Sequence, residues 1–426
     1  MWESLGTSRR QDRVLHGAAK ALNVVIGLVV LPLWLVGQRL VEPLKLLLAK
    51  LDEGPSPPLP VPPERERSMS ALMAELEAIP GDLRPRPLAE LRKGLADLST
   101  FVLSQTRETS GLGYSYPAQF VDHVFEGADG ERIAATIATH DERRPALIIA
   151  HGLFTSRRFD YVRQIAVSAF FDWGFDVAAL DLRSFGLTQY TSAAPSSAGW
   201  KEGEDIVALS RYVKQLGSTS VGALGISLGG CSVLDACDVD GAEDALDGGI
   251  LAVSPPAEPR AVAERLSRQL PRRHPAYALN YAFHAMLVSR VRGAGWPAEI
   301  GTLLDPIELL AAPYYELGAD ELWRRAAPLE HIAGALVPVL VLHPEDDRII
   351  KVEEARKLAD RAAANDLVRV WVLPAGKHGI LDAVDYDWTY AVYRTFFERW
   401  AGYAERAEPA PRRGSAVNGA AATVRK

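Results

Sequence analysis

The sequence is poor in cysteine, with only Cys231 and Cys237 among 426 residues. The two lie six residues apart in one predicted helix, so they point to different faces and indicate buried thiols rather than a disulfide framework. The chain also lacks the cysteine spacing of a zinc site and the glycine-rich loop that holds nucleotide phosphates. Two common signatures of metal and nucleotide sites are therefore missing.

An excess of basic residues is absent as well. Lys and Arg number 47 against 54 Asp and Glu, which gives a formal net charge of −7. A protein that neutralises phosphates needs a basic face, so this charge argues against a nucleic-acid partner. The apolar fraction of 48% and the charged fraction of 24% are ordinary for a soluble globular protein. The length is long for one compact domain and short for three.

The N-terminus carries one long apolar run, residues 21–37, "ALNVVIGLVVLPLWLVG". As a helix it spans about 26 Å, just short of a hydrocarbon core of about 30 Å. No small-residue cleavage site follows it, so a removed signal peptide fits poorly. We expect a membrane anchor or interfacial helix, with the side of the membrane open because basic residues flank the run on both sides. The alternative is a helix packed on the protein's own body, in a cytoplasmic protein.

The rest of the chain divides by composition. A proline-rich linker at 55–67 follows the N-terminal extension and predicts an extended, unfolded connection. We expect the tail to be disordered. The predicted order is an N-terminal hydrophobic extension (1–54), the linker (55–67), a helical pre-domain (68–117), a catalytic domain (118–403) with an inserted helical cap (about 255–335), and a tail (404–426).

Between about 118 and 403, short apolar runs alternate with helix-length segments. Two runs flank the turn "EGADGE" and predict an antiparallel hairpin. The strands that follow alternate with helices, which predicts right-handed crossovers and an α/β fold with a mostly parallel sheet and helices on both faces. These further strands are predicted at 146–150, 177–182, 221–227, 248–254, 337–342 and 368–374.

Three of the predicted strands end in residues that can carry out chemistry. Ser227 follows "VGALGI" within a G-x-S-x-G, the acids of "HPEDDRII" follow "VPVLVL", and His378 follows "VRVWVLP". Parallel strands present their carboxyl ends at one edge, where ligands bind. Serine, then acid, then histidine is the chain order of the nucleophile-elbow hydrolases. The pattern predicts Ser227 as nucleophile and His378 as its base.

Each of these residue types has a physical task. A serine hydroxyl needs a base that takes its proton, imidazole titrates near neutrality, and a carboxylate fixes the imidazole tautomer. Gly225 and Gly229 leave room for a strained strand-to-helix turn. Backbone N–H groups of Leu228, at the start of a helix, and of Leu153, after "ALIIAHG", can bind the developing oxyanion. We expect His151 to be structural and Gly152 to give the backbone room to turn.

The acid is ambiguous because "EDD" offers three carboxylates. Asp347 fits a loop in which the carboxylate precedes the apolar pair Ile349 and Ile350, which can pack and lock it. Asp346 is the alternative.

These motifs resemble the α/β-hydrolase superfamily. Within it, three stretches are similar to the YheT-like esterases and their ABHD-type relatives: "HGLFTS" at 151–156, "GISLGG" at 225–230, and residues 314–351. The resemblance implies a serine hydrolase of carboxylic esters, lipids among them, that needs no metal or organic cofactor. It also implies Ser227, Asp347 and His378 as the triad and Leu153 and Leu228 as oxyanion donors. The chain departs from the family at Pro344 and Ser184, where glycine is usual, and at Arg348, where proline often follows the acid.

We expect a small-molecule ester as the substrate, with a lipid-like ester as the leading expectation. About 80 residues, 255–335, separate two predicted strands and indicate a helical cap. Its apolar, aromatic segment at 277–291 has the pattern of a core helix, and some of its side chains can also roof the site. Two alternatives stay open: an acyltransferase on the same triad with an alcohol acceptor, and a non-catalytic binding protein. The sequence does not predict the oligomeric state.

Overall fold

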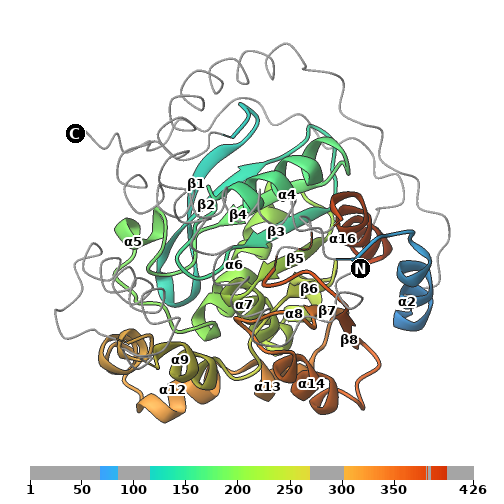
Figure 1. The fold of residues 1–426 in the computed structure, drawn as a ribbon. Helices are drawn as coiled ribbons and strands as arrows, with labels where there is room; N and C mark the ends of the chain where they lie inside the picture. The colour runs from blue at the N-terminus through green and yellow to red at the C-terminus, as the bar shows by residue number, and fades with distance from the viewer. Residues whose placement is uncertain (1–67, 85–115, 269–301, 380, 382–384, 401–426) are drawn as a thin grey trace, which may run out of the picture.

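An eight-stranded sheet forms the centre of the molecule (Figure 1). The structure is a computed structural model, which describes residues 68–84, 116–268, 302–379, 381 and 385–400. The strand order is β1-β2-β4-β3-β5-β6-β7-β8. The predicted segments 1–54, 55–67, 277–291 and 404–426 lie outside the described residues.

The sheet is mostly parallel, as predicted. β1 and β2 form the expected antiparallel hairpin, β2 is antiparallel to β4, and all other neighbouring strands are parallel. The strands are β1 (Val121–Glu126), β2 (Arg132–Ala138), β3 (Ala146–Ala150), β4 (Asp176–Leu180), β5 (Val221–Ile226), β6 (Ile250–Val253), β7 (Val339–Pro344) and β8 (Val368–Leu373). Each predicted strand is present, with bounds shifted by a few residues at most.

Helices cover both faces of the sheet. On one face lie α4 (Asp160–Phe171) and α16 (Tyr386–Trp400), with α2 (Met69–Ala78) packed on α16. On the other face lie α6 (Trp200–Leu216), α7 (Leu228–Asp235) and α14 (Val352–Arg361). Shorter elements are η3 (Ala128–Gly130), α5 (Thr188–Thr191), η4 (Ala236–Asp238) and α8 (Ala242–Ala245). Figure 1 shows α2 beside α16 at the edge of the molecule.

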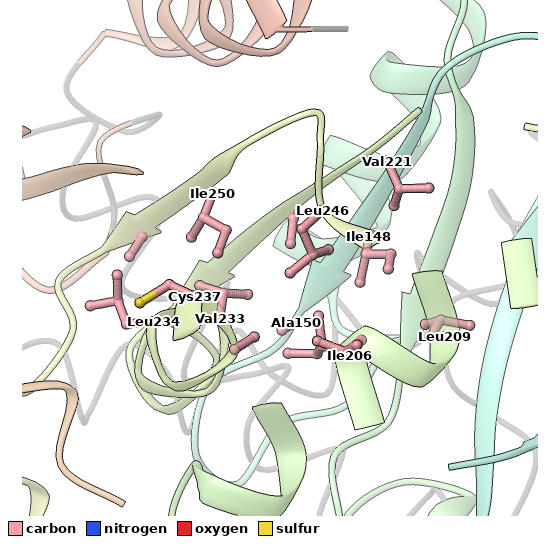
Figure 2. Packing of buried hydrophobic residues seen from close by; sticks show 14 of the residues in the cluster. Ile148, Ala150, Ile206, Leu209, Val221, Val233, Leu234, Cys237, Leu246 and Ile250 are labelled. Carbon is pink, nitrogen blue, oxygen red and sulfur yellow. The ribbon is translucent and has the colours of Figure 1, made fainter. Parts of the chain in front are cut away.

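The central strands are apolar throughout because both of their faces are buried. Along β3, Ile148 and Ala150 enter the cluster under α6 and α7, whereas Leu147 and Ile149 enter the cluster under α4 and α16. Figure 2 shows the first of these clusters, in which Ile206 of α6 and Val233 of α7 meet the strand residues. This burial on both faces is the reason that continuous apolar runs predicted these strands correctly.

The connections place the site at one point of the sheet. From β3 the chain crosses through α4 to β4 on one side, and then through α6 to β5 on the other side of β3. Right-handed crossovers that run in opposite directions put their helices on opposite faces and leave a crevice at the carboxyl ends of the strands between them. Here that crevice lies where β3 and β5 end.

In the described residues between β6 and β7, the regular structure is helical, and turns and irregular stretches join the helices. Its elements are α9 (Pro259–Ser267), the π-helix η5 (Pro306–Ala311), α11 (Ala312–Tyr314), α12 (Ala319–Arg325), α13 (Pro328–His331) and η6 (Ile332–Gly334). A small separate core holds this segment together, and Ile307, Leu322 and Trp323 lie within it. The loop that carries Ala198 packs into the same core.

Arg183 joins the sheet to this helical segment. Its buried guanidinium donates to both carboxylate oxygens of Asp205 on α6, at 2.7 and 2.8 Å, and to the hydroxyl of Tyr315 at 2.9 Å. Tyr315 follows α11 and in turn donates to the Pro195 carbonyl at 2.6 Å. A planar guanidinium suits this bidentate pairing. Through these contacts Arg183 connects α6 to the helical segment between β6 and β7.

Both cysteines are buried and free, as predicted. They do not share one helix, however. Cys231 lies in α7, which ends at Asp235, and Cys237 lies in the short helix η4 that follows. Among the residues that the structure describes, no helix combines the length and the apolar character that a membrane span requires.

Candidate active site

Ser227 stands alone between a strand and a helix. β5 ends at Ile226 and α7 begins at Leu228, so the serine occupies the turn itself, as the sequence predicts. Its backbone has φ 59° and ψ −116°, a conformation that a side chain other than glycine's adopts only under strain. The Ser227 N–H donates to the Val253 carbonyl of β6 at 2.9 Å, which ties the turn to the sheet. The strain is therefore held by the surrounding structure.

The two glycines that flank Ser227 are required by space. A Cβ on Gly225 would lie 2.1 Å from the Gly229 carbonyl oxygen, and a Cβ on Gly229 would lie 2.3 Å from the Ala150 carbonyl oxygen. Both obstacles are backbone atoms, which cannot rotate away. Gly152 differs, because a Cβ there would meet its nearest neighbours at 3.4 Å, an ordinary contact. The prediction that the turn after β3 needs glycine for room is therefore wrong.

His378 lies within hydrogen-bond distance of both of its predicted partners. Its Nε2 atom is 2.9 Å from Ser227 Oγ and its Nδ1 atom is 2.8 Å from Asp347 Oδ2. A carboxylate can only accept, so Nδ1 carries the proton and Nε2 accepts the serine hydroxyl. The chain beside His378 is anchored as well, because Gly379 N–H donates to Ser254 Oγ at 3.2 Å. In this order the three groups can pass the serine proton to the imidazole.

The carboxylate next to His378 is that of Asp347. It is 2% exposed, and its Oδ1 accepts the N–H groups of Ile349 and Ile350 at 2.8 and 2.9 Å. Asp346 faces another way and accepts the Lys377 N–H at 2.8 Å. The expected packing of an apolar pair is half wrong, because Ile350 is buried but Ile349 is 42% exposed. Backbone N–H groups, rather than two packed side chains, hold this acid.

The two backbone groups predicted to bind an oxyanion lie beside Ser227. Leu228 is the first residue of α7, so its N–H belongs to the positive end of that helix. Leu153 follows Gly152, where an added Cβ would touch Ser227 Cβ at 3.4 Å. Within the described part of the chain, neither N–H has a hydrogen-bond partner. Both donors are therefore left to bind a ligand or water.

Sequence reasoning missed a second histidine close to Asp347, His343. It is fully buried at the end of β7, and its Nε2 lies 3.0 Å from the Ile350 carbonyl oxygen and 3.9 Å from Asp347 Oδ2. Burial lowers the pKa of His343, so the ring is neutral at pH 7 and donates through Nε2. Its contact closes the loop from Pro344 to Ile350. The available signal was one polar residue at the end of an apolar strand.

His151 is fully buried, and its ring makes structural contacts. Its Nε2 accepts the Leu182 N–H at 3.1 Å, and its ring packs edge-on against Phe185. For metals, the described residues contain no group of three or more His, Cys, Asp or Glu that could hold an ion.

A family model described as "Alpha/beta hydrolase family" matches residues 147–392, more than half of the chain. This span includes Ser227, Asp347 and His378. No curated protein sequence matches the chain.

Among solved structures, the chain is similar to the Pyrococcus furiosus esterase Pf2001, at 18% identity and a TM-score of 0.49, covering 66% of this chain and 92% of that one. A puromycin-hydrolyzing peptidase of Mycobacterium tuberculosis follows at 16% and 0.45, covering 68% and 40%. Est1E of Butyrivibrio proteoclasticus has 15% and 0.40, covering 65% and 96%. Similarities this low carry no argument about substrate or reaction.

Proposed function

The chain belongs to the alpha/beta hydrolase family, and from that premise we propose that it is a serine hydrolase that cleaves carboxylic esters through an acyl-enzyme on Ser227. Its eight-stranded, mostly parallel sheet with helices on both faces is the α/β-hydrolase fold. The observation that carries the proposal is the hydrogen-bonded series Ser227–His378–Asp347 at the carboxyl ends of the strands.

In this proposal Ser227 Oγ attacks the ester carbonyl while His378 Nε2 takes its proton. Asp347 stabilises the imidazolium and holds its orientation. The N–H groups of Leu228 and Leu153 bind the negative charge that develops on the carbonyl oxygen. His378 then protonates the leaving alcohol, and water that enters its place hydrolyses the acyl-enzyme with His378 acting again as base. No step draws on a metal or an organic cofactor.

The test compares wild type with Ser227→Ala on p-nitrophenyl esters and with a fluorophosphonate probe that labels activated serines. We expect loss of labelling and a fall in kcat of about 10⁴- to 10⁶-fold. Ser220→Ala is the matched control, because Ser220 is buried beside the opposite end of β5. Unchanged ester turnover in Ser227→Ala would refute the proposal. An added alcohol that diverts the product from acid to a new ester would instead identify an acyltransferase.

The proposed substrate class is an apolar ester, lipid-like esters first. The stretches 151–156, 225–230 and 314–351 support an ester through their resemblance to the YheT-like esterases, and the apolar segment 277–291 lies outside the described residues. A panel of esters graded by acyl chain length is expected to give kcat/KM that rises with chain length. A preference for acetyl esters over all longer chains would count against it.

We also propose that residues 21–37 attach the chain to a membrane surface. The segment is uncharged and about 26 Å long as a helix. Full-length protein is expected in the membrane fraction, and a variant without residues 1–54 in the soluble fraction. Full-length protein that remains entirely soluble would refute this proposal.

A further inference from the structure

The Gly152 carbonyl oxygen attracts an unusual number of donors. Thr155 Oγ1 lies 2.8 Å from it, His151 Nδ1 lies 2.7 Å from it, and the Thr155 N–H donates to it at 3.3 Å. His151 Nε2 already accepts the Leu182 N–H, so the ring proton is on Nδ1 and points to Gly152. Three groups from one short turn therefore fix a single carbonyl.

A peptide unit is planar and trans, so its C=O and N–H point in opposite directions. The carbonyl of Gly152 and the N–H of Leu153 belong to the same unit. Donors that hold the carbonyl on one side therefore turn the Leu153 N–H to the other side. That N–H is one of the two donors beside Ser227 without a partner among the described residues.

A fourth residue completes a closed ring of hydrogen bonds. The Gly152 N–H donates to the Tyr161 hydroxyl at 2.7 Å, and Tyr161 Oη lies 3.1 Å from Thr155 Oγ1. Since Thr155 Oγ1 donates its proton to the Gly152 carbonyl, it accepts the proton of Tyr161. Each hydroxyl in this ring, Tyr161 and Thr155, donates once and accepts once, and such rings strengthen each member through polarisation.

The turn needs this support because its backbone is strained. Phe154, between Leu153 and Thr155, has φ 60°, in the left-handed region that non-glycine residues avoid. Without external contacts the peptide units of such a turn can rotate to relieve the strain. Backbone strain of this kind is common at functional sites, where surrounding contacts maintain it. Phe154 lies two residues after Gly152, which is beside Ser227.

We propose that the hydroxyl of Thr155, with His151 and Tyr161, is a positioning group that aims the Leu153 N–H at the oxyanion of the reaction. The inference rests on the proposed function and names residues that act through the peptide rather than on the substrate. Loss of the Thr155 hydroxyl therefore weakens binding of the tetrahedral oxyanion more than binding of the planar ester, and this difference distinguishes a positioning role from a structural one.

The test is Thr155→Val, which keeps the shape of the side chain and removes the hydroxyl. We expect kcat to fall about 10- to 100-fold, less than complete loss of one oxyanion donor, with KM changed by less than about threefold. The inhibition constant of a trifluoromethyl ketone, whose adduct with Ser227 carries an oxyanion, is expected to rise by a similar factor. Thr155→Ser restores the hydroxyl and is expected to recover most of kcat.

The matched control is Ser156→Ala, which removes the neighbouring hydroxyl, one that accepts the Arg158 N–H at 3.3 Å. We expect it to leave kcat and inhibition unchanged. If Thr155→Val folds poorly by circular dichroism, Tyr161→Phe removes the other hydroxyl of the ring and predicts the same selective loss.

Two results overturn the inference alone. In a folded Thr155→Val or Tyr161→Phe protein, an unchanged kcat would show that the ring does not position the donor. Equal loss of substrate and inhibitor binding would show a structural role alone. A wild-type protein that turns over no ester and takes up no fluorophosphonate would instead overturn the proposed function, and the inference with it.

Discussion

Asp347 and His378 form a hydrogen bond of 2.8 Å between Oδ2 and Nδ1, although Asp346 is one residue away and 30% exposed at its side chain. The adjacent acid instead accepts the Lys377 N–H. The two neighbouring carboxylates thus contact neighbouring residues of one loop: Asp346 binds the backbone of Lys377, and Asp347 binds the ring of His378.

This relationship separates the two acids experimentally. Asp347→Asn presents an amide to His378 and favours the wrong imidazole tautomer, so kcat is expected to fall about 10⁴-fold. Asp346→Asn retains an oxygen that accepts the Lys377 N–H and is expected to stay within about threefold of wild type. Steady-state kinetics on one ester measures both. A larger loss in Asp346→Asn than in Asp347→Asn would contradict the assignment.

The glycines near Ser227 differ in the space around them, and stability measurements can detect the difference. Gly229→Ala places a methyl group 2.3 Å from the Ala150 carbonyl oxygen and is expected to cost about 1–3 kcal/mol or more of unfolding free energy. Gly152→Ala, with its nearest contacts at 3.4 Å, is expected to cost less than about 1 kcal/mol. Urea unfolding followed by circular dichroism gives both values, and equal losses would contradict the geometry.

Arg183 offers a test of how the helical segment is held. Arg183→Met leaves the Asp205 carboxylate buried without its partner, and we expect a loss of about 3–5 kcal/mol. Tyr315→Phe removes one hydroxyl from the same cluster and is expected to cost about 1–2 kcal/mol. Thermal melts of the two variants should differ clearly. If Arg183→Met has the same unfolding free energy as wild type, the Arg183–Asp205 pair contributes no stability.

His331 predicts a pH dependence of stability. Burial lowers the pKa of His331, but the hydrogen bond to Asp238, the charge of Asp235 and the Arg325 carbonyl outweigh burial and raise it to about 9. A raised pKa contributes stability that is complete below the unfolded value of about 6.5 and disappears as pH rises through 9. Unfolding free energy is therefore expected to fall by about 3 kcal/mol over this range.

Two aspartates close together in the sequence separate the effect of His331 on stability from that of other groups. Asp238→Asn weakens the contact at 3.0 Å and is expected to flatten the dependence between pH 6.5 and 9, whereas the exposed Asp240→Asn is expected to preserve it. Urea unfolding at several pH values measures the slopes. An identical slope in Asp238→Asn would show that another group titrates.

The sheet and the positions of Ser227, Asp347 and His378 were predictable because each follows an apolar run, and the ends of parallel strands meet at one edge. The choice between Asp346 and Asp347 was harder, because adjacent residues share every sequence signal and differ only in side-chain direction. Ile349 and Ile350 were expected to pack alike, but Ile349 is exposed. The loop there is held by hydrogen bonds to Asp347 rather than by apolar contacts.

The polar support around the site could not be predicted in the same way. The contacts of Thr155, Tyr161 and His343 depend on the path of short turns, and hydrogen-bonding residues in turns have no period in sequence. Arg183 likewise pairs with Asp205 across two elements, and nothing in "DLRSFGLT" marks it as buried. Apolar patterning predicts layers, whereas the partner of a polar side chain is a property of the finished tertiary structure.

Ser227 and His378 are 151 residues apart, and the helical segment between β6 and β7 lies between them in the chain. Contacts of such long range form late, because the loop between them must close before they stabilise anything. During synthesis the turn that carries Ser227 leaves the ribosome well before His378 does. On the proposed mechanism, a nascent chain without β8 carries Ser227 with no base beside it, and labelling by a serine-reactive probe is expected only once β8 has docked.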